Sequence, residues 1–163
     1  MFPDDVRRQA EVVLATARAK GLTIATAESC TGGLVAGSLT EIAGSSDVVE
    51  RGFVTYANEA KTEMLGVPAD LIAKVGAVSE EVARAMAEGV LTHAPVDLAV
   101  SITGIAGPGG GSSEKPVGLV HFACARRGQA TWHERHVFPG DRSAIRLAAV
   151  RVALTLLLQG TQT

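Results

Sequence analysis

The stretch TAESCTGGL, residues 26–34, constrains the fold more than any other part of the chain. A short apolar and β-branched run, 22–27, overlaps its start, and two glycines lie near its end. This pattern predicts a buried strand that turns directly into a helix. Two further runs of the same kind, 51–58 and 97–103, are each followed by a helical or glycine-rich segment. Strands that alternate with helices in this way are typical of α/β proteins.

Helices are predicted around these strands from apolar spacing and from start and stop signals, over 4–20, 31–42, 59–65, 79–93 and from 141 onward. Asn58 and Asp141 are placed to cap two of them, and Gly21 and Gly66 to end two. The runs 117–126 and 130–138 predict a hairpin. We therefore expect one domain, residues 1–163, with an α/β fold: a three-layer α/β/α sandwich around a mixed, mainly parallel sheet.

Composition argues against several classes of protein. A net charge of −2 with interspersed acids and bases offers no basic face to a nucleic acid, so nucleic-acid binding is not expected. The N-terminal MFPDDVRRQAEVVL interrupts its apolar positions with charge, unlike a signal peptide or a membrane span, so we expect a cytoplasmic protein. Cys30 and Cys124 lack zinc-site spacing, and His133 and His136 do not share a strand face. Free thiols, no metal and no cofactor are expected.

Three loops follow the predicted strands at the edge of the sheet where α/β proteins bind ligands. They are AESCTGG, TYANEAK and the glycine-rich GIAGPGGGSSEKP, residues 104–116. Together they offer a hydroxyl, a phenol, an ammonium and open backbone amides, a set that favours a hydrolase. The glycine-rich loop lacks the lysine of a Walker loop and does not match the dinucleotide fingerprint, so a nucleoside-triphosphate site is not supported.

Ser29 is the candidate nucleophile of this set. A serine hydroxyl needs a base, and a lysine with a lowered pKa is one known solution. Lys61 follows a neighbouring strand, so a parallel arrangement would bring it beside Ser29, and burial would lower its pKa. Tyr56 could link the two residues or steer the lysine. Amides after Ser29 suit a developing oxyanion.

Each of these residues also has a simpler explanation when taken alone. Ser29 can be a helix cap, Lys61 a solvated surface lysine, and Tyr56 a packing residue with a wet tip. Cys30 is the more reactive nucleophile in intrinsic chemistry, although no histidine is near it in sequence. We rank Cys30 second to Ser29.

Two charged positions remain open between structural and functional readings. Glu28 could orient a substrate, or simply balance the positive end of a helix. Arg142, beside Asp141 at the head of the last helix, could bind a phosphate, or Asp141 could be an ordinary cap.

Five sequence blocks are more specific than the spacing of single residues: AESCTGG, RGFVTYANEAK, GAVSEE, SITGIAGPGGGSSEKPVG and FPGDR. In this order they closely resemble the CinA C-terminal domain family, over roughly residues 8–158. Stand-alone members of that family are nicotinamide-mononucleotide amidohydrolases. The resemblance implies hydrolysis of the nicotinamide amide of nicotinamide mononucleotide to nicotinic acid mononucleotide and ammonia, without a metal. The larger N-terminal domain of two-domain members has no counterpart in these blocks, which narrows the expected activity to the amidase.

The family's catalytic residues fall on this chain at Ser29, Tyr56 and Lys61. The residues that we expect to line the substrate are Glu28, Cys30, Thr31, Gly32, Thr103, Gly104 and Arg142. The main alternative is a non-catalytic nucleotide-binding or regulatory module of the same fold, against which the intact catalytic residues argue. The nearly continuous apolar run LAAVRVALTLLL also suggests a homodimer or a higher homo-oligomer, unless the sheet alone covers that helix.

Overall fold

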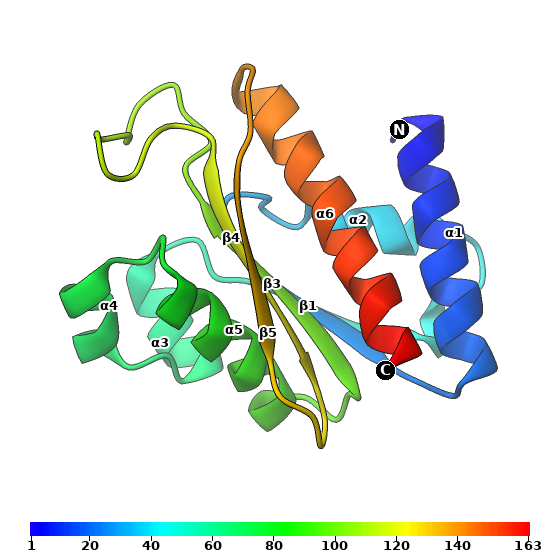
Figure 1. Ribbon diagram of the computed structural model, residues 1–163. Coiled ribbons are helices and arrows are strands. Elements are labelled where there is room, and N and C mark those ends of the chain that lie inside the picture. The colour runs from blue at the N-terminus through cyan, green and yellow to red at the C-terminus, as the bar shows by residue number, and fades with distance from the viewer.

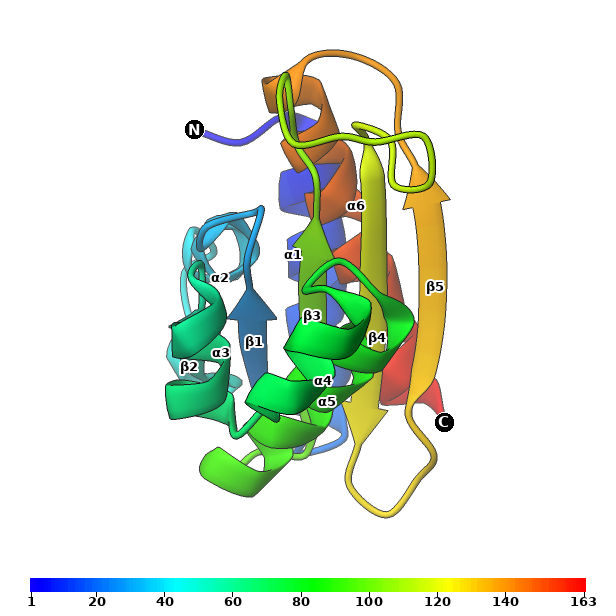
Figure 2. The same cartoon turned by 90° about the vertical axis from the view of Figure 1, so that its left-hand side faces the viewer.

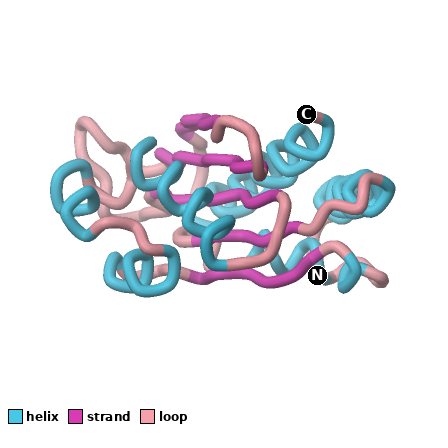
Figure 3. Tube along the Cα trace, turned by 90° about the horizontal axis from the view of Figure 1, so that it is seen from below, coloured by secondary structure: helices cyan, strands magenta, loops and turns pink.

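A five-stranded sheet forms the middle layer of the computed structural model, which describes residues 1–163 (Figures 1 and 3). Its strands are β1 (Ile24–Glu28), β2 (Val49–Val54), β3 (Leu98–Gly104), β4 (Leu119–Arg126) and β5 (Trp132–Val137). Their order across the sheet is β2-β1-β3-β4-β5. β1 is parallel to β2 and β3, and β4 is antiparallel to β3 and β5, so four of the five strands run in one direction. The predicted α/β sandwich with a mixed, mainly parallel sheet is confirmed.

Helices cover both faces of this sheet. They are α1 (Asp4–Ala19), α2 (Leu34–Thr40), α3 (Asn58–Leu65), α4 (Ala69–Val75), α5 (Glu80–His93) and α6 (Arg142–Gln162). α1, α2 and α6 pack on one face and α3, α4 and α5 on the other, as Figures 2 and 3 show. Because side chains alternate along a strand, Ile24 of β1 belongs to the first core and its neighbour Ala25 to the second.

The core on the α5 side is built from small residues where that helix meets the sheet. Ala83 and Ala87 of α5 pack on Ala123 and Ala125 of β4, all four buried. Such short side chains allow a helix to lie close to a strand.

α6 is long and apolar enough to span a bilayer by length and composition, and half of its apolar window is buried within this fold. Its buried residues include Ala149, Leu154 and Leu157, which belong to the core shared with α1 and the sheet. Asp141 caps the helix as predicted, accepting the Ala144 amide at 2.9 Å. The protein's own core thus accounts for half of this apolar window.

Several boundaries differ from the sequence-based expectation. α2 begins at Leu34 rather than near residue 31, because a separate turn follows β1. α3 has Ala57, without a side-chain cap, where a capping Asn58 was predicted. α4 was not predicted, because seven residues between Pro68 and Gly76 are too few to show a helical period. The stops at Gly21 and Gly66 are confirmed by their left-handed backbone.

Candidate active site

The carboxyl ends of β1 and β2 lie at the same edge of the sheet because the two strands are parallel. Ser29 directly follows β1, and its amide donates to the carbonyl of Ile102 at 2.9 Å. Thr55 directly follows β2, and its amide donates to the carbonyl of Glu28 at 2.9 Å. The chain segments that leave the two strands are therefore fixed to one another before either turns away.

Lys61, in the first turns of α3, reaches back to this edge. Its Nζ lies 3.2 Å from Ser29 Oγ, 2.8 Å from the carbonyl oxygen of Thr55 and 3.2 Å from that of Tyr56. Lys61 is 1 % exposed and Ser29 is 9 % exposed. No carboxylate forms a salt bridge with this lysine, and burial lowers its pKa because an ammonium loses hydration there. The predicted pairing of Lys61 with Ser29 is present in the fold.

The three partners of Lys61 suit its amine in either protonation state. Two of them, the carbonyls of Thr55 and Tyr56, can only accept hydrogen bonds, and they take the two protons of an –NH₂ group. The third, the Ser29 hydroxyl, accepts a hydrogen bond from Nζ when the lysine is an ammonium, and it can donate its own proton to the lone pair when the amine is neutral. This is the arrangement that a general base needs.

Glu28 is fully buried, and its carboxylate is occupied within the protein. It accepts the amides of Gly33 at 3.2 Å, Val35 at 2.9 Å and Ala36 at 3.0 Å, and the Thr26 hydroxyl at 3.2 Å. These amides form the positive end of α2. Of the two readings of Glu28, the geometry supports the partner of a helix. It also means that the start of α2 is not free to stabilise an oxyanion.

Free amides lie instead in the turn between β1 and α2. The Gly32 amide donates to the Ser29 carbonyl at 3.0 Å and closes this turn, with Gly32 in a left-handed conformation. The amides of Cys30 and Thr31 make no hydrogen bond within the protein. The buried hydroxyls of Thr31 and Thr55 likewise have no hydrogen-bond partner within the protein.

The backbone of Tyr56, and not its phenol, contacts Lys61 in this structure. Its carbonyl binds Lys61, whereas its side chain is 60 % exposed and its hydroxyl accepts from Arg142 Nη2 at 3.2 Å. The phenol makes no hydrogen bond to Ser29 or Lys61. Arg142 also donates to the carbonyl of Gly107 at 2.8 Å, so it joins the glycine-rich loop to the side chain of Tyr56.

Arg142 also lines a surface hollow of about 440 Å³ at the start of α6. Its other lining residues include Asp141, Ser143 and Pro108. The hollow therefore lies between the start of α6 and the glycine-rich loop, which meet at one end of the molecule in Figure 2. Ser29 and Lys61 lie outside this hollow and line no other hollow of the isolated chain.

Thr103 and Gly104 end β3, the strand next to β1. Thr103 is buried and donates its hydroxyl to the carbonyl of Ala77 at 2.9 Å. A side chain at Gly104 would approach the carbonyl oxygen of Leu119 to 2.8 Å, so only glycine fits beside β4 there. Both residues therefore have structural roles, a hydrogen bond for Thr103 and close packing for Gly104, that the sequence around them does not reveal.

Cys30 is the rival nucleophile, and its surroundings do not favour a thiolate. It is 5 % exposed, and burial raises the pKa of its thiol to about 11. A protonated thiol is a poor nucleophile at neutral pH. Its carbonyl, however, accepts from Arg146 Nε at 3.0 Å, a contact that ties the turn to α6.

Arg146 was not singled out from the sequence, although a signal existed. It lies four residues after Arg142 on α6, so the two guanidinium groups share one face of the helix. Arg146 Nη2 also donates to the carbonyl of Thr31 at 3.3 Å. Arg146, far along the chain, therefore binds the carbonyl groups of the turn that follows Ser29.

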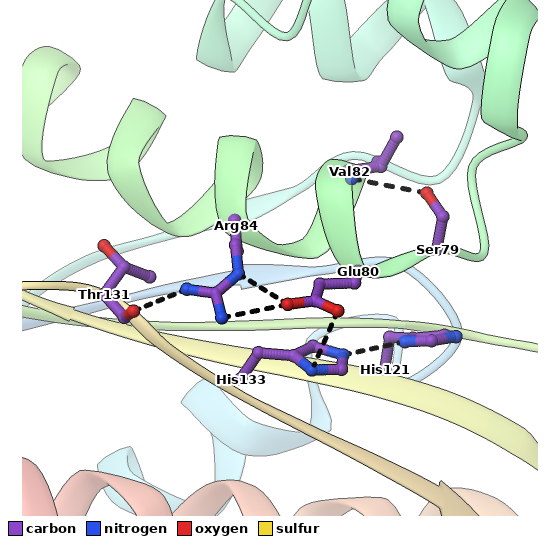
Figure 4. Close-up of polar contacts among 7 residues, drawn as sticks. All are labelled: Ser79, Glu80, Val82, Arg84, His121, Thr131 and His133. Atoms are coloured by element: carbon purple, nitrogen blue, oxygen red, sulfur yellow. Dashed lines mark hydrogen bonds and ion pairs between the residues drawn. The ribbon is translucent and has the colours of Figure 1, made fainter.

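A second polar cluster was also missed and lies on the α5 face of the sheet (Figure 4). His121 Nδ1 and His133 Nε2 are 2.8 Å apart, and Glu80 Oε2 lies 3.7 Å from His133 Nδ1. Arg84 pairs with Glu80 at 2.9 Å on the other side. The register of the predicted hairpin brings the two histidines together, because His133 pairs with Ala123, two residues from His121 and on the same face.

Comparison with known proteins places this geometry in a family. The model of the CinA C-terminal domain matches residues 6–161. Nicotinamide-nucleotide amidohydrolase PncC of Shigella flexneri is 53 % identical over 161 residues, covering 98 % of this chain and 96 % of that protein. A putative competence-damage inducible protein of Symbiobacterium thermophilum is 53 % identical over 146 residues, and the match covers 85 % of this chain but only 34 % of that longer protein.

A solved structure gives the same result. The crystal structure of competence/damage inducible protein CihA from Agrobacterium tumefaciens is 50 % identical, with a TM-score of 0.97 over 100 % of this chain and 99 % of that one. The fold, the order of the sequence blocks and the matched range agree with one another, and this chain belongs to the CinA C-terminal domain family.

Proposed function

We propose that this chain hydrolyses the carboxamide of nicotinamide mononucleotide, with Ser29 as nucleophile and Lys61 as general base. The observation that carries the mechanism is the 3.2 Å contact between Lys61 Nζ and Ser29 Oγ, in which the lysine is buried and has no carboxylate partner. The substrate follows from relatives that are 52–53 % identical over nearly the whole chain and are named nicotinamide-nucleotide amidohydrolases.

In the first half of this mechanism, Ser29 Oγ bonds to the amide carbon while its proton passes to Lys61 Nζ. The tetrahedral oxyanion is stabilised by backbone amides. Lys61 then gives the proton to the amide nitrogen, the carbon–nitrogen bond breaks, and ammonia leaves an acyl-enzyme.

In the second half, water attacks the acyl carbon and gives a proton to Lys61. The carbon–Ser29 bond breaks, and the serine recovers that proton. Nicotinic acid mononucleotide is the product. One lysine therefore moves protons in both halves of the reaction.

The residues around the pair have roles that follow from their contacts. Arg142 is the expected partner of the 5′-phosphate, since its guanidinium lies at the start of α6 next to Tyr56. Thr31, Gly32, Thr103 and Gly104 form the walls at the ends of β1 and β3. Glu28 and Cys30 support these walls, because the Glu28 carboxylate is engaged with α2 and the Cys30 thiol is buried.

The direct test is ammonia release from nicotinamide mononucleotide by the purified chain with a chelator present, comparing wild type with Ser29→Ala. Chelator-resistant release that is lost in the variant supports a serine amidohydrolase that needs no metal. If the wild type releases no ammonia but binds the nucleotide by calorimetry, the chain is a nucleotide-binding module and the proposal is wrong.

The remaining expectations accompany this proposal. We propose that the chain acts as a single domain in the cytoplasm, without a cofactor, in recycling of pyridine nucleotides, and that it forms a homodimer or a larger homo-oligomer. Light scattering at micromolar concentration tests the last point, and a monomer mass would refute it.

A further inference from the structure

We propose that Arg146 is a positioning residue for amide hydrolysis: it holds the peptides after Ser29 so that the free amides of Cys30 and Thr31 face the reacting carbonyl oxygen. This inference rests on the proposed function. It assigns the oxyanion donors and gives a role to a residue outside the serine–lysine pair.

The hydrogen bonds of Arg146 all go to backbone carbonyls of the turn after Ser29. Its Nε donates to the carbonyl of Cys30 at 3.0 Å, and its Nη2 donates to the carbonyl of Thr31 at 3.3 Å. The guanidinium fork thus binds two successive carbonyls, a geometry that a lysine cannot reproduce. Arg146 has no carboxylate partner, so these carbonyls are its only hydrogen-bonding partners within the protein.

A carbonyl held in place also sets the direction of an amide. In a trans peptide the C=O and the following N–H lie in one plane and point in opposite directions. Because Arg146 binds the carbonyl of Cys30 from the α6 side, the amide of Thr31, on the same peptide, points away from α6. The Ser29 carbonyl is fixed as well, by the Gly32 amide at 3.0 Å, and this orients the amide of Cys30.

The turn therefore has an occupied face and an open face. The carbonyls of Ser29, Cys30 and Thr31 all accept hydrogen bonds, whereas the amides of Cys30 and Thr31 have no partner. Buried backbone amides are nearly always paired, so two free ones beside a candidate nucleophile indicate donors reserved for a ligand oxygen. The positive end of α2 is not an alternative, because the Glu28 carboxylate binds the amides of Gly33, Val35 and Ala36.

Arg146 adds charge as well as geometry. Its cation lies at the negative, carbonyl end of the two peptide dipoles, so it stabilises the orientation in which their positive ends face Ser29. Gly32 keeps this arrangement possible, since a Cβ there would lie 3.3 Å from Arg146 Nη2. Without the guanidinium, the carbonyl of Cys30 would lose its donor, whereas that of Thr31 would keep the amide of Leu34 at 3.0 Å. The peptide between Cys30 and Thr31 would then be free to rotate its amide away from Ser29.

The test uses the full-length chain and three variants: Arg146→Met, Arg146→Lys and Arg146→Ala. Arg151→Met is the matched control, because it removes an arginine from the same helix that pairs with Asp5 on the surface. Steady-state ammonia release gives kcat and KM for nicotinamide mononucleotide, and thermal unfolding verifies that each variant is folded.

A second readout reports on the tetrahedral state, which the oxyanion donors stabilise. 3-Pyridylboronic acid is the probe: Ser29 Oγ adds to boron, the serine proton passes to Lys61, and a tetrahedral boronate anion forms with a hydroxyl at the oxyanion position. The inhibition constant of the boronate rises when the oxyanion donors are misplaced, whereas KM reports on binding of the ground-state substrate.

We expect Arg146→Met to lower kcat by about 10²–10³-fold, the usual cost of a lost oxyanion donor, and to weaken boronate inhibition in parallel while KM changes little. Arg146→Lys should recover only part of kcat, and millimolar guanidinium should partly restore Arg146→Ala. Arg151→Met should resemble the wild type.

Three outcomes overturn the inference: an Arg146→Met kcat equal to that of the wild type, a change confined to KM, or a loss of kcat with boronate inhibition unchanged. If Arg146→Met does not fold, the decision passes to Arg146→Lys, and the same three outcomes in that variant refute the role. An inactive wild type is a different failure, since it refutes the proposed function itself.

Discussion

Lys61 Nζ lies 2.8 Å from the carbonyl oxygen of Thr55, the shortest contact that this buried amine makes. With the Tyr56 carbonyl at 3.2 Å, it leaves Ser29 as the only partner able to give Lys61 a proton. The protonation state of one lysine therefore decides whether the hydroxyl can be activated, and this makes pH the first variable to examine.

Activity should rise with pH as Lys61 loses its proton. Burial lowers the pKa of this lysine, so the rise in kcat/KM should centre below the usual pKa of a lysine side chain. Lys61→Met should reduce turnover by about 10²–10⁴-fold, the usual contribution of a general base, and remove the rise. Lys74→Met, an exposed lysine on α4, is the control and should keep the wild-type profile. A pH profile identical in Lys61→Met would refute the assignment of the base.

Lys61 should also affect stability. Between its lowered folded pKa and the usual lysine value, the unfolded chain binds the extra proton, so the free energy of unfolding of the wild type should increase with pH across that window. Urea unfolding at a series of pH values measures this slope. The slope should be smaller in Lys61→Met and unchanged in Lys74→Met.

Glu28→Gln should destabilise the protein even though it alters few atoms. The carboxylate accepts hydrogen bonds on both oxygens, and an amide group would present a donor to the amide of Ala36 or to those of Gly33 and Val35. An unmade buried hydrogen bond of this kind costs about 1–3 kcal/mol. Chemical unfolding should show this loss of stability, whereas Glu11→Gln, at an exposed position on α1, should show none. Equal stability of Glu28→Gln and wild type would mean that α2 does not depend on this acceptor.

Cys30→Ala should leave turnover close to that of the wild type, because the thiol is buried and burial raises its pKa to about 11. A thiol reagent at neutral pH should not modify Cys30 in the folded chain and should modify it after unfolding. Ser29→Ala assayed in parallel provides the comparison. Activity that survives in Ser29→Ala but not in Cys30→Ala would show that the nucleophile has been misassigned.

The sequence predicted the central pair of the site because its placement depends on local rules. Ser29 and Lys61 each follow a strand, and parallel neighbouring strands end at one edge, so their meeting could be expected. The role of Tyr56 could not, because a residue type does not reveal that the backbone carbonyl, rather than the phenol, contacts the lysine. Arg146 meets Cys30 across 116 residues, and only the path of α6 over the turn brings them together.

Arg142→Gln should weaken catalysis on the nucleotide but not on nicotinamide riboside, which lacks the phosphate. A charge-assisted hydrogen bond contributes about 1.5–3 kcal/mol, so kcat/KM for the mononucleotide should fall by about 10–100-fold, mainly through KM. Tyr56→Phe should have a smaller effect of the same kind, since it removes only the hydroxyl that receives Arg142 Nη2. Arg135→Gln, a change at an exposed position on β5, should not distinguish the two substrates. An equal loss of kcat/KM on both substrates would show that Arg142 does not recognise the phosphate.

The contact between His121 and His133 should make the stability of the fold sensitive to acid (Figure 4). Their 2.8 Å contact requires one ring nitrogen to accept, and burial lowers the pKa of His121 from 6.5 to about 4. The pKa of His133 is also lowered, chiefly by burial, although Glu80 opposes the shift. Arg84, Arg135 and Lys115 supply the surrounding positive charge.

Because unfolded histidines bind protons that the folded pair does not, the free energy of unfolding should fall as pH decreases from about 6.5 to about 4. His121→Gln keeps a polar partner for His133 and removes one titrating group, so its stability should decline less over that range. His93→Gln, at the exposed end of α5, should decline as the wild type does. Parallel curves for His121→Gln and wild type would show that the acid sensitivity arises elsewhere in the fold.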